Sequence, residues 1–121
     1  MKKVLVCEDD SGISGVIEII LTENGYEVVI VDNGRGIEKK VLGFKPDVIL
    51  LDIRMPGIGG EEIIFLLKKK EETAKIPVIV VSALDNVASK AAKMGADGFL
   101  LKPFKIDVLL AKLKAVLPTS H

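Results

Sequence analysis

An unbroken apolar run that ends on one carboxylate limits most strongly what this chain can fold into. Val48 to Leu51 contains four apolar residues without a polar break, and Asp52 follows directly. The Pro and Gly residues between Asp52 and Gly60 cannot continue a strand. A continuous run of Val, Ile and Leu is typical of a parallel strand that is buried on both faces. We therefore expect Asp52 at the carboxyl end of a central strand, where open α/β sheets place their chemistry.

Other short apolar runs alternate with segments of helical periodicity along the rest of the chain. We expect the strands at residues 4–7, 26–31, 48–51, 78–81 and 99–101. The expected helices follow them at residues 12–24 with Ser11 as N-cap, at 36–42, 60–70 and 86–94, and at 109–117, where Pro118 ends the last one. Five strands that alternate with five helices predict an α/β fold with a parallel sheet covered on both faces.

Composition agrees with one soluble domain, which we interpret as residues 1–121 of the 121-residue chain. Lys plus Arg and Asp plus Glu both total 17, so the net charge of zero disfavours direct nucleic-acid binding. The N-terminus turns acidic at Glu8, too early for a secretory segment or a membrane span, so we expect a cytoplasmic protein without a membrane partner. Cys7 is the only cysteine and lies in an apolar run, which predicts a buried thiol and no disulfide.

Polar residues of particular types follow the carboxyl ends of the expected strands. Glu8 and Asp9 follow the first strand, Asp52 the third, Ser82 the fourth and Lys102 the fifth. Right-handed crossovers bring all carboxyl ends of a parallel sheet to one edge. Three carboxylates, one hydroxyl and one ammonium therefore meet in one crevice if the first and third strands are neighbours.

Carboxylates placed this close together repel one another, so they either take up protons or bind a cation. Oxygen ligands without a His or Cys partner favour Mg²⁺, or Mn²⁺ in its place, over zinc. With the negative charge screened, Asp52 could attack a phosphoryl donor as a nucleophile. Lys102 and Ser82 would then stabilise phosphoryl oxygens by charge and by a hydrogen bond.

Each of these residues also has an ordinary structural interpretation. Asp9 or Asp10 could cap the helix that follows, and Ser82 could cap the next segment. Lys102 could extend its ammonium to solvent at a strand end, and an aromatic residue such as Phe99 is more often part of a core. Together, these interpretations require several coincidences at one sheet edge. Among the other charged residues, we assign Asp32 and Asp47 to turns. We interpret Lys68, Lys69 and Lys70 first as a solvated helix end and second as a binding patch.

Four motifs, in this order, resemble the receiver domain of two-component response regulators. They are Glu8-Asp9, Asp52 in the sequence LLDIRMPG, Ser82-Ala83 and Lys102-Pro103-Phe104. The resemblance covers about residues 3–117. It implies a doubly wound, flavodoxin-like (βα)5 fold whose parallel strands have the order 2-1-3-4-5. It also implies a signalling switch without turnover of an external substrate.

The resemblance further implies a role for each site residue. Asp52 would be the phosphoacceptor, with Lys102 and Ser82 assisting it, and Ser82 with Phe99 would form a switch pair. Asp9, Asp52 and the backbone carbonyl of Arg54 would bind Mg²⁺ directly, and Glu8 would assist through a water molecule. The Lys102–Pro103 peptide bond is expected to be cis. A histidine kinase, a phosphotransfer protein or a small acyl phosphate would donate the phosphoryl group.

Phosphorylation would then change a surface formed by the segment 86–94, the strand 99–101 and the last helix. The inward residues of the segment 86–94 are expected to be Val87, Ala88, Ala91 and Ala92, which are mostly small, so its packing should be shallow. This surface would control an effector protein or an output domain, in a monomer or a phosphorylation-dependent dimer. Because only four residues follow Leu117, we favour a stand-alone receiver over a fragment of a longer regulator.

Three positions depart from the commonest receiver pattern. Glu8 is one methylene longer than the usual aspartate, which could change metal affinity. Gly59 replaces a frequent acidic residue, so the third helix depends on Glu61 and Glu62 to complement its dipole. Arg54 places a cation two residues after Asp52, where we expect it to influence the lifetime of the phosphoryl group.

Other functions fit this sequence less well. An enzyme of the haloacid-dehalogenase type needs two Asp spaced by one residue at the first strand, which Glu8-Asp9-Asp10 does not supply. A flavodoxin-like FMN carrier needs a Ser/Thr-rich phosphate loop where this chain has three carboxylates. A degenerate receiver that acts only as a protein-docking module is the remaining alternative.

Overall fold

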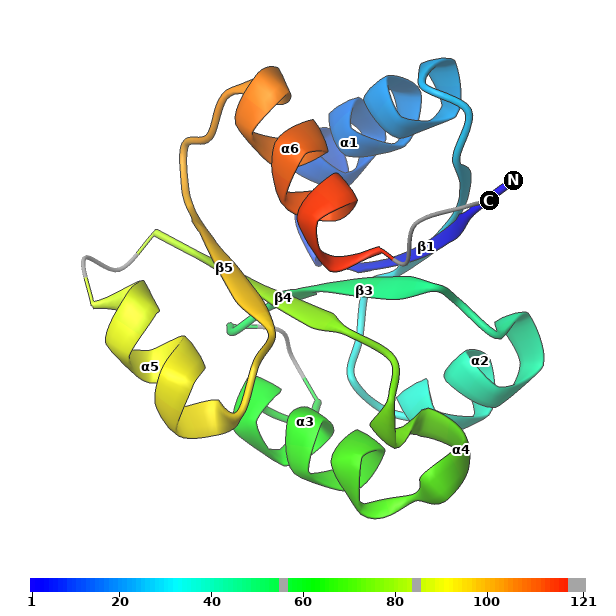
Figure 1. The fold of residues 1–121 in the computed structure, drawn as a ribbon, viewed down its shortest axis with the longest axis vertical. Coiled ribbons are helices and arrows are strands. Elements are labelled where there is room, and N and C mark those ends of the chain that lie inside the picture. The colour runs from blue at the N-terminus through cyan, green and yellow to red at the C-terminus, as the bar shows by residue number, and fades with distance from the viewer. Residues whose placement is uncertain (55–56, 84–85, 118–121) are drawn as a thin grey trace.

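Five parallel strands form a single sheet in the order β2-β1-β3-β4-β5, which confirms the predicted topology (Figure 1). The computed structural model describes residues 1–54, 57–83 and 86–117. The strands are β1 (Lys3–Cys7), β2 (Glu27–Val31), β3 (Val48–Asp52), β4 (Val78–Ser82) and β5 (Gly98–Leu101). In the ladder between β1 and β3, Cys7 lies opposite Leu51. The residues that follow these two strands therefore share one edge of the sheet.

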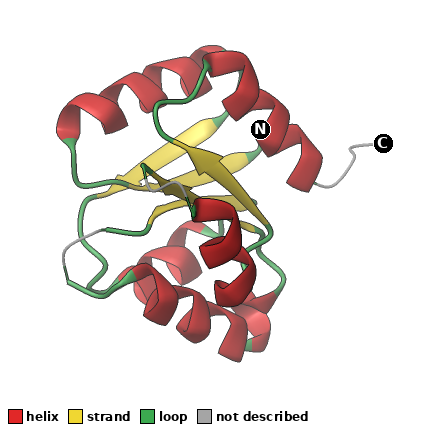
Figure 2. Ribbon diagram, turned by 90° about the vertical axis from the view of Figure 1, so that its left-hand side faces the viewer, coloured by secondary structure: helices red, strands yellow, loops and turns green. Residues whose placement is uncertain are grey.

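Helices cover both faces of the sheet (Figures 1 and 2). The described residues form α1 (Ser11–Glu23), α2 (Ile37–Phe44), α3 (Gly60–Lys69), α4 (Glu71–Ala74), α5 (Val87–Met94) and α6 (Ile106–Val116). Helices α1 and α6 lie on one face, and α2, α3, α4 and α5 lie on the other. None of these helices is long and apolar enough to cross a membrane.

The core has two layers because successive residues of a strand point to opposite faces of the sheet. On β3, Ile49 and Leu51 pack toward α2, α3 and α5, whereas Val48 and Leu50 pack toward α1 and α6. All five residues of β3 and all five of β4 are buried. This double burial explains why the central strands are unbroken apolar runs, and it confirms that Cys7 is a buried core residue.

The N-cap of α1 is Asp10, and the prediction of Ser11 as the cap is wrong. Asp10 Oδ1 accepts hydrogen bonds from the backbone N–H groups of Gly12 (2.9 Å) and Ile13 (3.1 Å). Asp10 has extended backbone angles, while Ser11 is already the first helical residue. The carboxylate can therefore reach the free N–H groups of the first turn, as an N-cap must.

The chain between α3 and β4 contains the short helix α4, which was not predicted from the sequence. Lys70 adopts extended backbone angles and separates α4 from α3. The Thr73 hydroxyl then donates a hydrogen bond of 2.5 Å to the Leu67 carbonyl and closes the turn. The interpretation of the α3 termini is confirmed, since Glu61 and Glu62 lie in the first turn and Gly59 offers no side-chain cap.

Only half of the expected inward residues of α5 face the core. Val87 and Ala91 are buried, whereas Ala88 and Ala92 are exposed. A spacing of four residues keeps Val87 and Ala91 on one helical face, and their neighbours at the next position turn away from it. The predicted end of the last helix at Pro118 lies outside the described residues.

Candidate functional site

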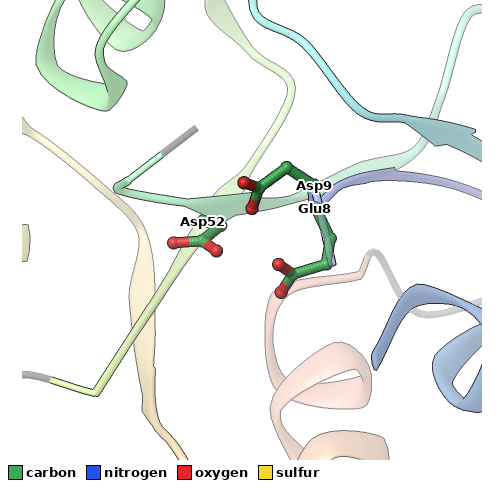
Figure 3. Close-up of side chains that lie close together, drawn as sticks. All are labelled: Glu8, Asp9 and Asp52. Carbon is green, nitrogen blue, oxygen red and sulfur yellow. The ribbon is translucent and has the colours of Figure 1, made fainter. Parts of the chain in front are cut away.

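Three carboxyl groups point toward a common space at the carboxyl ends of β1 and β3 (Figure 3). Glu8 and Asp9 directly follow β1, and Asp52 is the last residue of β3. One carboxylate oxygen from each residue lies within 4.8 Å of those of the other two. Glu8 and Asp52 are buried, with exposed fractions of 3% and 8%, while Asp9 is exposed. The structure therefore brings the predicted acidic triad together, with an open side at Asp9.

A single ammonium group joins two of these carboxylates. Lys102 Nζ lies 2.7 Å from Glu8 Oε1 and 3.2 Å from Asp52 Oδ2. The backbone N–H of Lys102 donates to the Ser82 carbonyl at 2.8 Å, which continues the pairing of β5 with β4 into the site. The next peptide bond, Lys102–Pro103, is cis, as the resemblance implied. Lys102 is thus held by its backbone at one end and by two carboxylates at the other.

The pKa values of Glu8 and Lys102 show how the charges balance. Burial raises the pKa of the Glu8 carboxyl group and nearby Asp52 raises it further, which together outweigh the opposing hydrogen bond from Lys102. Burial alone would lower the pKa of Lys102, but its hydrogen bonds and charge interactions with Glu8 and Asp52 raise it above its usual value. Lys102 therefore keeps its charge at neutral pH, and one cation faces three carboxyl groups.

The excess of negative charge and the type of ligand atom both suit a hard divalent cation. The cluster supplies carboxylate oxygens and no thiol or imidazole, which is the ligand set of Mg²⁺ and not of zinc. The cavity at this site has a volume of about 280 Å³ and is also lined by Arg54 and Ser82. The residues present therefore fit the predicted cation.

The loop after β3 orients the Asp52 side chain through a backbone hydrogen bond. The backbone N–H of Arg54 donates to Asp52 Oδ1 at 3.0 Å, and the Arg54 side chain is exposed. Both Asp52 oxygens thus accept a hydrogen bond, one from this backbone group and the other from Lys102. The carboxylate is oriented, and the cavity remains open beside it.

The two residues of the predicted switch pair lie in different surroundings. Ser82 ends β4, is buried and lines the same cavity as the three carboxylates. Phe99 on β5 is half-buried, packs against the core layer beneath α2, α3 and α5, and has Lys112 Nζ 4.8 Å from its ring centroid. The structure therefore places Ser82 at the site and Phe99 outside its lining, so the switch pair stays a prediction.

Two further features position the site; the sequence left open whether Asp10 supports the site or only the helix start, and it did not predict the second feature. The Asp10 backbone N–H donates to Glu8 Oε2 at 3.3 Å, so Asp10 orients Glu8 as well as capping α1. A Cβ atom on Gly57, which has a φ of +91°, would overlap Asn33 Oδ1. The loop after Asp52 is therefore packed closely against the turn after β2. The Asn33-Gly34 pair was the available signal, although it indicated only a turn.

Comparison with known proteins identifies a family that this sequence matches. The family model described as "Response regulator receiver domain" matches residues 4–114. The chain is 34% identical over 119 residues to the DNA-binding dual master transcriptional regulator RpaA of Synechocystis, with coverage of 97% of this chain and 49% of the relative. It is 36% identical over 118 residues to the phosphate regulon transcriptional regulatory protein PhoB of Pseudomonas aeruginosa, with coverage of 96% and 52%. The chain thus spans about half the length of these curated relatives.

Solved structures show the same likeness in three dimensions. The chemotaxis response regulator CheY4 of Vibrio cholerae superposes with a TM-score of 0.89 at 30% identity, covering 97% of this chain and 99% of the other. The response regulator TrrA of Thermotoga maritima, solved in complex with Mg²⁺-BeF, gives a TM-score of 0.86 at 33% identity, covering 97% and 100%.

Proposed function

The chain belongs to the response regulator receiver domain family of two-component signalling, and from this premise we propose that Asp52 is its phosphoacceptor. The observation that carries the proposal is the position of Asp52 between Lys102, 3.2 Å away, and a cavity that Ser82 and Asp9 also line. Glu8 is less suitable, because its exposed fraction is only 3% and burial raises the pKa of its carboxyl group, which disfavours the nucleophilic carboxylate form. Asp9 is exposed and less confined.

In the proposed reaction, an Asp52 carboxylate oxygen attacks the phosphorus of a phosphohistidine or a small acyl phosphate. The new P–O bond forms as the bond from phosphorus to the donor's nitrogen or oxygen breaks, and the donor leaves with that electron pair. The Lys102 ammonium already lies 3.2 Å from Asp52, and it would form an ion pair with one oxygen of the transferred phosphoryl group. The Ser82 hydroxyl would donate a hydrogen bond to another oxygen of the same group.

The cation is part of the same proposal. Glu8, Asp9, Asp52 and the backbone carbonyl of Arg54 would hold Mg²⁺, or Mn²⁺ in its place, which when bound neutralises charge on the phosphoryl oxygens. The chain would catalyse only its own phosphorylation and dephosphorylation, without turnover of an external substrate. Arg54, exposed beside the cavity, would influence how long the phosphoryl group lasts.

Phosphorylation would change the surface formed by α5, β5 and α6, and this change would transmit the signal. A phosphoryl group of charge about −1.5 to −2 attracts the Ser82 hydroxyl at the end of β4, and Phe99 would move with it as the switch partner. Only two residues of α5, Val87 and Ala91, are buried, so this helix is held by few apolar side chains. The surface would act on an effector protein or an output domain, in a monomer or a phosphorylation-dependent dimer in the cytoplasm, with a sensor kinase or phosphotransfer protein as donor.

Incubation with acetyl phosphate and Mg²⁺ tests the central step. We expect intact-mass spectrometry to show one added phosphoryl group on the wild-type chain, because Asp52 lies beside both the cavity and Lys102. Asp52→Asn should show none, since the amide is a poor nucleophile, and removal of divalent cations with EDTA should abolish the signal.

The matched control is Asp47→Asn, which makes the same chemical change at the opposite edge of the sheet. Asp47 accepts a hydrogen bond from the Lys3 backbone at 2.7 Å and lies outside the cavity, so this variant should be phosphorylated like the wild type. Wild-type protein that folds and binds Mg²⁺ but gains no phosphoryl group would contradict the proposal and favour a receiver used only for docking.

A further inference from the structure

A groove lies between helices α3 and α5, on the face of the sheet that these helices cover. Its volume is about 780 Å³. Ile64 and Phe65 of α3 form one wall, and Met94 at the end of α5 contributes to the other. The groove and the cavity around Asp52 have no lining residue in common. The groove is therefore a separate site from the cavity of the proposed phosphoacceptor.

Phe65 is the apolar feature of this groove. All four phenylalanines of the chain lie in the described residues, and Phe65, with an exposed fraction of 63%, is the only exposed one; Phe44, Phe99 and Phe104 are half-buried. Exposed aromatic rings are enriched at the centres of protein interfaces, where their burial contributes much of the binding energy. Met94, half-buried beside the ring, has a flexible side chain that adapts to different partners. An apolar side chain could therefore pack between Phe65 and Met94.

Lysines surround this apolar centre on both sides. Lys69 on α3 has its Nζ 5.7 Å from the Phe65 ring centroid, and Lys93 lies on the wall formed by α5. Both are exposed, and neither forms an ion pair within the parts of the chain that the structure describes. Lys68 also lines the groove, but its ammonium is bound to Asp97 at 3.2 Å. Each wall thus presents one lysine whose charge has no carboxylate partner among the described residues.

This charge is local to the groove. Glu61 is the only carboxylate among the lining residues, against the three lysines, although the whole chain has a net charge of zero. A ligand that buries Phe65 must also satisfy these ammonium groups or leave them facing its own charges. Complementary charge selects partners and suppresses wrong ones. Carboxylates on both sides of an apolar side chain match this arrangement, and basic or purely apolar segments do not.

We propose that the groove between α3 and α5 docks a short acidic segment of a partner protein. One large apolar side chain of the segment packs on Phe65, and flanking aspartate or glutamate residues face Lys69 and Lys93. This surface shares the end of α5 with the one formed by α5, β5 and α6, but it extends to α3, which carries Phe65 and Lys69.

The test uses a short fluorescent peptide in which glutamates surround a pair of leucines, titrated with the full chain in fluorescence anisotropy. The expected result is saturable binding, weakened about tenfold or more by Phe65→Ser and by the double variant Lys69→Glu/Lys93→Glu. The matched control is Lys40→Glu/Lys114→Glu, which reverses two exposed charges on α2 and α6 and should leave the affinity within about twofold. A peptide with serines in place of the leucines should bind at least about tenfold more weakly.

Amide chemical shifts of the labelled chain locate the bound peptide. The proposal expects changes centred on residues 61–69 and 93–95, with phosphorylation by acetyl phosphate unchanged in Phe65→Ser. Three results of the peptide titrations would overturn it: no saturable binding, equal weakening in the control double variant, or shift changes centred outside the groove. Shift changes at residues 61–69 that grow with protein concentration in the absence of peptide would identify a second copy of the chain as the occupant and would also overturn it.

Discussion

At the amino ends of the strands, Asp47 and Asp97 each accept a hydrogen bond from a backbone N–H, whereas at the carboxyl ends Glu8, Asp9 and Asp52 face one another. Asp47 Oδ2 lies 2.7 Å from the Lys3 nitrogen, and Asp97 Oδ2 lies 2.8 Å from the Val78 nitrogen. In the triad, one carboxylate oxygen of each residue lies within 4.8 Å of the others. The acidic side chains at the amino edge therefore face hydrogen-bond donors, whereas those at the carboxyl edge face one another's negative charge.

The difference shows that the partner of a carboxylate decides what it can do. At the amino edge the first N–H groups of β1 and β4 need acceptors, and Asp47 and Asp97 supply them. At the carboxyl edge Lys102 is the ammonium that contacts the cluster within the described residues, and it is shared by two carboxylates. Negative charge is thus satisfied at one edge and left in excess at the other, which is what the binding of a divalent cation requires.

Replacing one lysine at each edge should show the largest contrast. Lys102→Met leaves Glu8 and Asp52 buried without their cation, and we expect it to lower the free energy of unfolding by about 3 kcal/mol at neutral pH without divalent ions. Lys68→Met removes the pair with Asp97 and two hydrogen bonds to the Ala74 and Ile76 carbonyls, and it should cost about 1 kcal/mol. The Lys68–Asp97 pair is more exposed, at 30% and 42% of the side chains, and Asp97 keeps its bond to Val78.

Urea unfolding of both variants measures this contrast, with the wild type as reference. Mg²⁺ should recover part of the loss in Lys102→Met and none in Lys68→Met, because a bound cation stabilises the state that binds it. If both variants lost the same free energy of unfolding, the carboxyl edge would not hold the excess of negative charge assigned to it.

Removing a carboxylate from the amino edge should have a smaller effect, on stability alone. Asp97→Ala leaves the Val78 N–H and Lys68 Nζ without this acceptor, which we expect to cost about 2 kcal/mol in urea unfolding. Phosphorylation by acetyl phosphate should persist in the folded variant. Asp32→Ala, at an exposed turn, is the control and should stay within about 0.5 kcal/mol of the wild type. An unchanged free energy of unfolding in Asp97→Ala would refute the structural role assigned to this edge.

The smallest predicted effect concerns Cys7, a buried ionisable group directly before Glu8. Burial raises the pKa of the Cys7 thiol from 9.0 to about 12. The thiol form is the neutral one, so its contribution to stability is complete below pH 9 and is lost as the pH rises toward 12. At pH 10 the folded state should be about 1.4 kcal/mol less stable than at pH 8 through this group.

Cys7→Ala separates the contribution of this thiol from that of every other group in the protein. The variant should be less stable at pH 8 because it leaves a cavity, but its stability should fall less between pH 8 and pH 10 than that of the wild type. Urea unfolding under reducing conditions gives both values. Identical falls in the two proteins would show that Cys7 does not resist ionisation as its burial requires.

The sequence was most informative where local pattern and burial coincide. The apolar run before Asp52 predicted β3, and the alternation of strands and helices predicted the layers, because a strand covered on both faces has to be apolar throughout. Strand order came from the resemblance to receiver domains, since periodicity does not specify which strands pair. Convergence of Glu8, Asp9 and Asp52 followed once β1 and β3 were neighbours.

The remaining features depend on information that no pattern carries. Asp10 and Ser11 are adjacent residues of equally good capping type, and backbone angles decide between them. Helix α4 is four residues long and follows a run of three lysines, so it lacks an apolar period to predict it. The shared contacts of Lys102 with Glu8 and Asp52 depend on how far a flexible side chain reaches across the sheet edge.

Chemical trapping of the phosphorylated residue tests the central claim most directly. Borohydride reduces an acyl phosphate on aspartate to a primary alcohol, which gives homoserine, and mass spectrometry of proteolytic peptides then locates it. After treatment with acetyl phosphate and Mg²⁺, we predict homoserine at position 52 alone and none without Mg²⁺. Reduction at Glu8 or Asp9, or at a site elsewhere in the chain while Asp52 stays unchanged, would contradict this assignment.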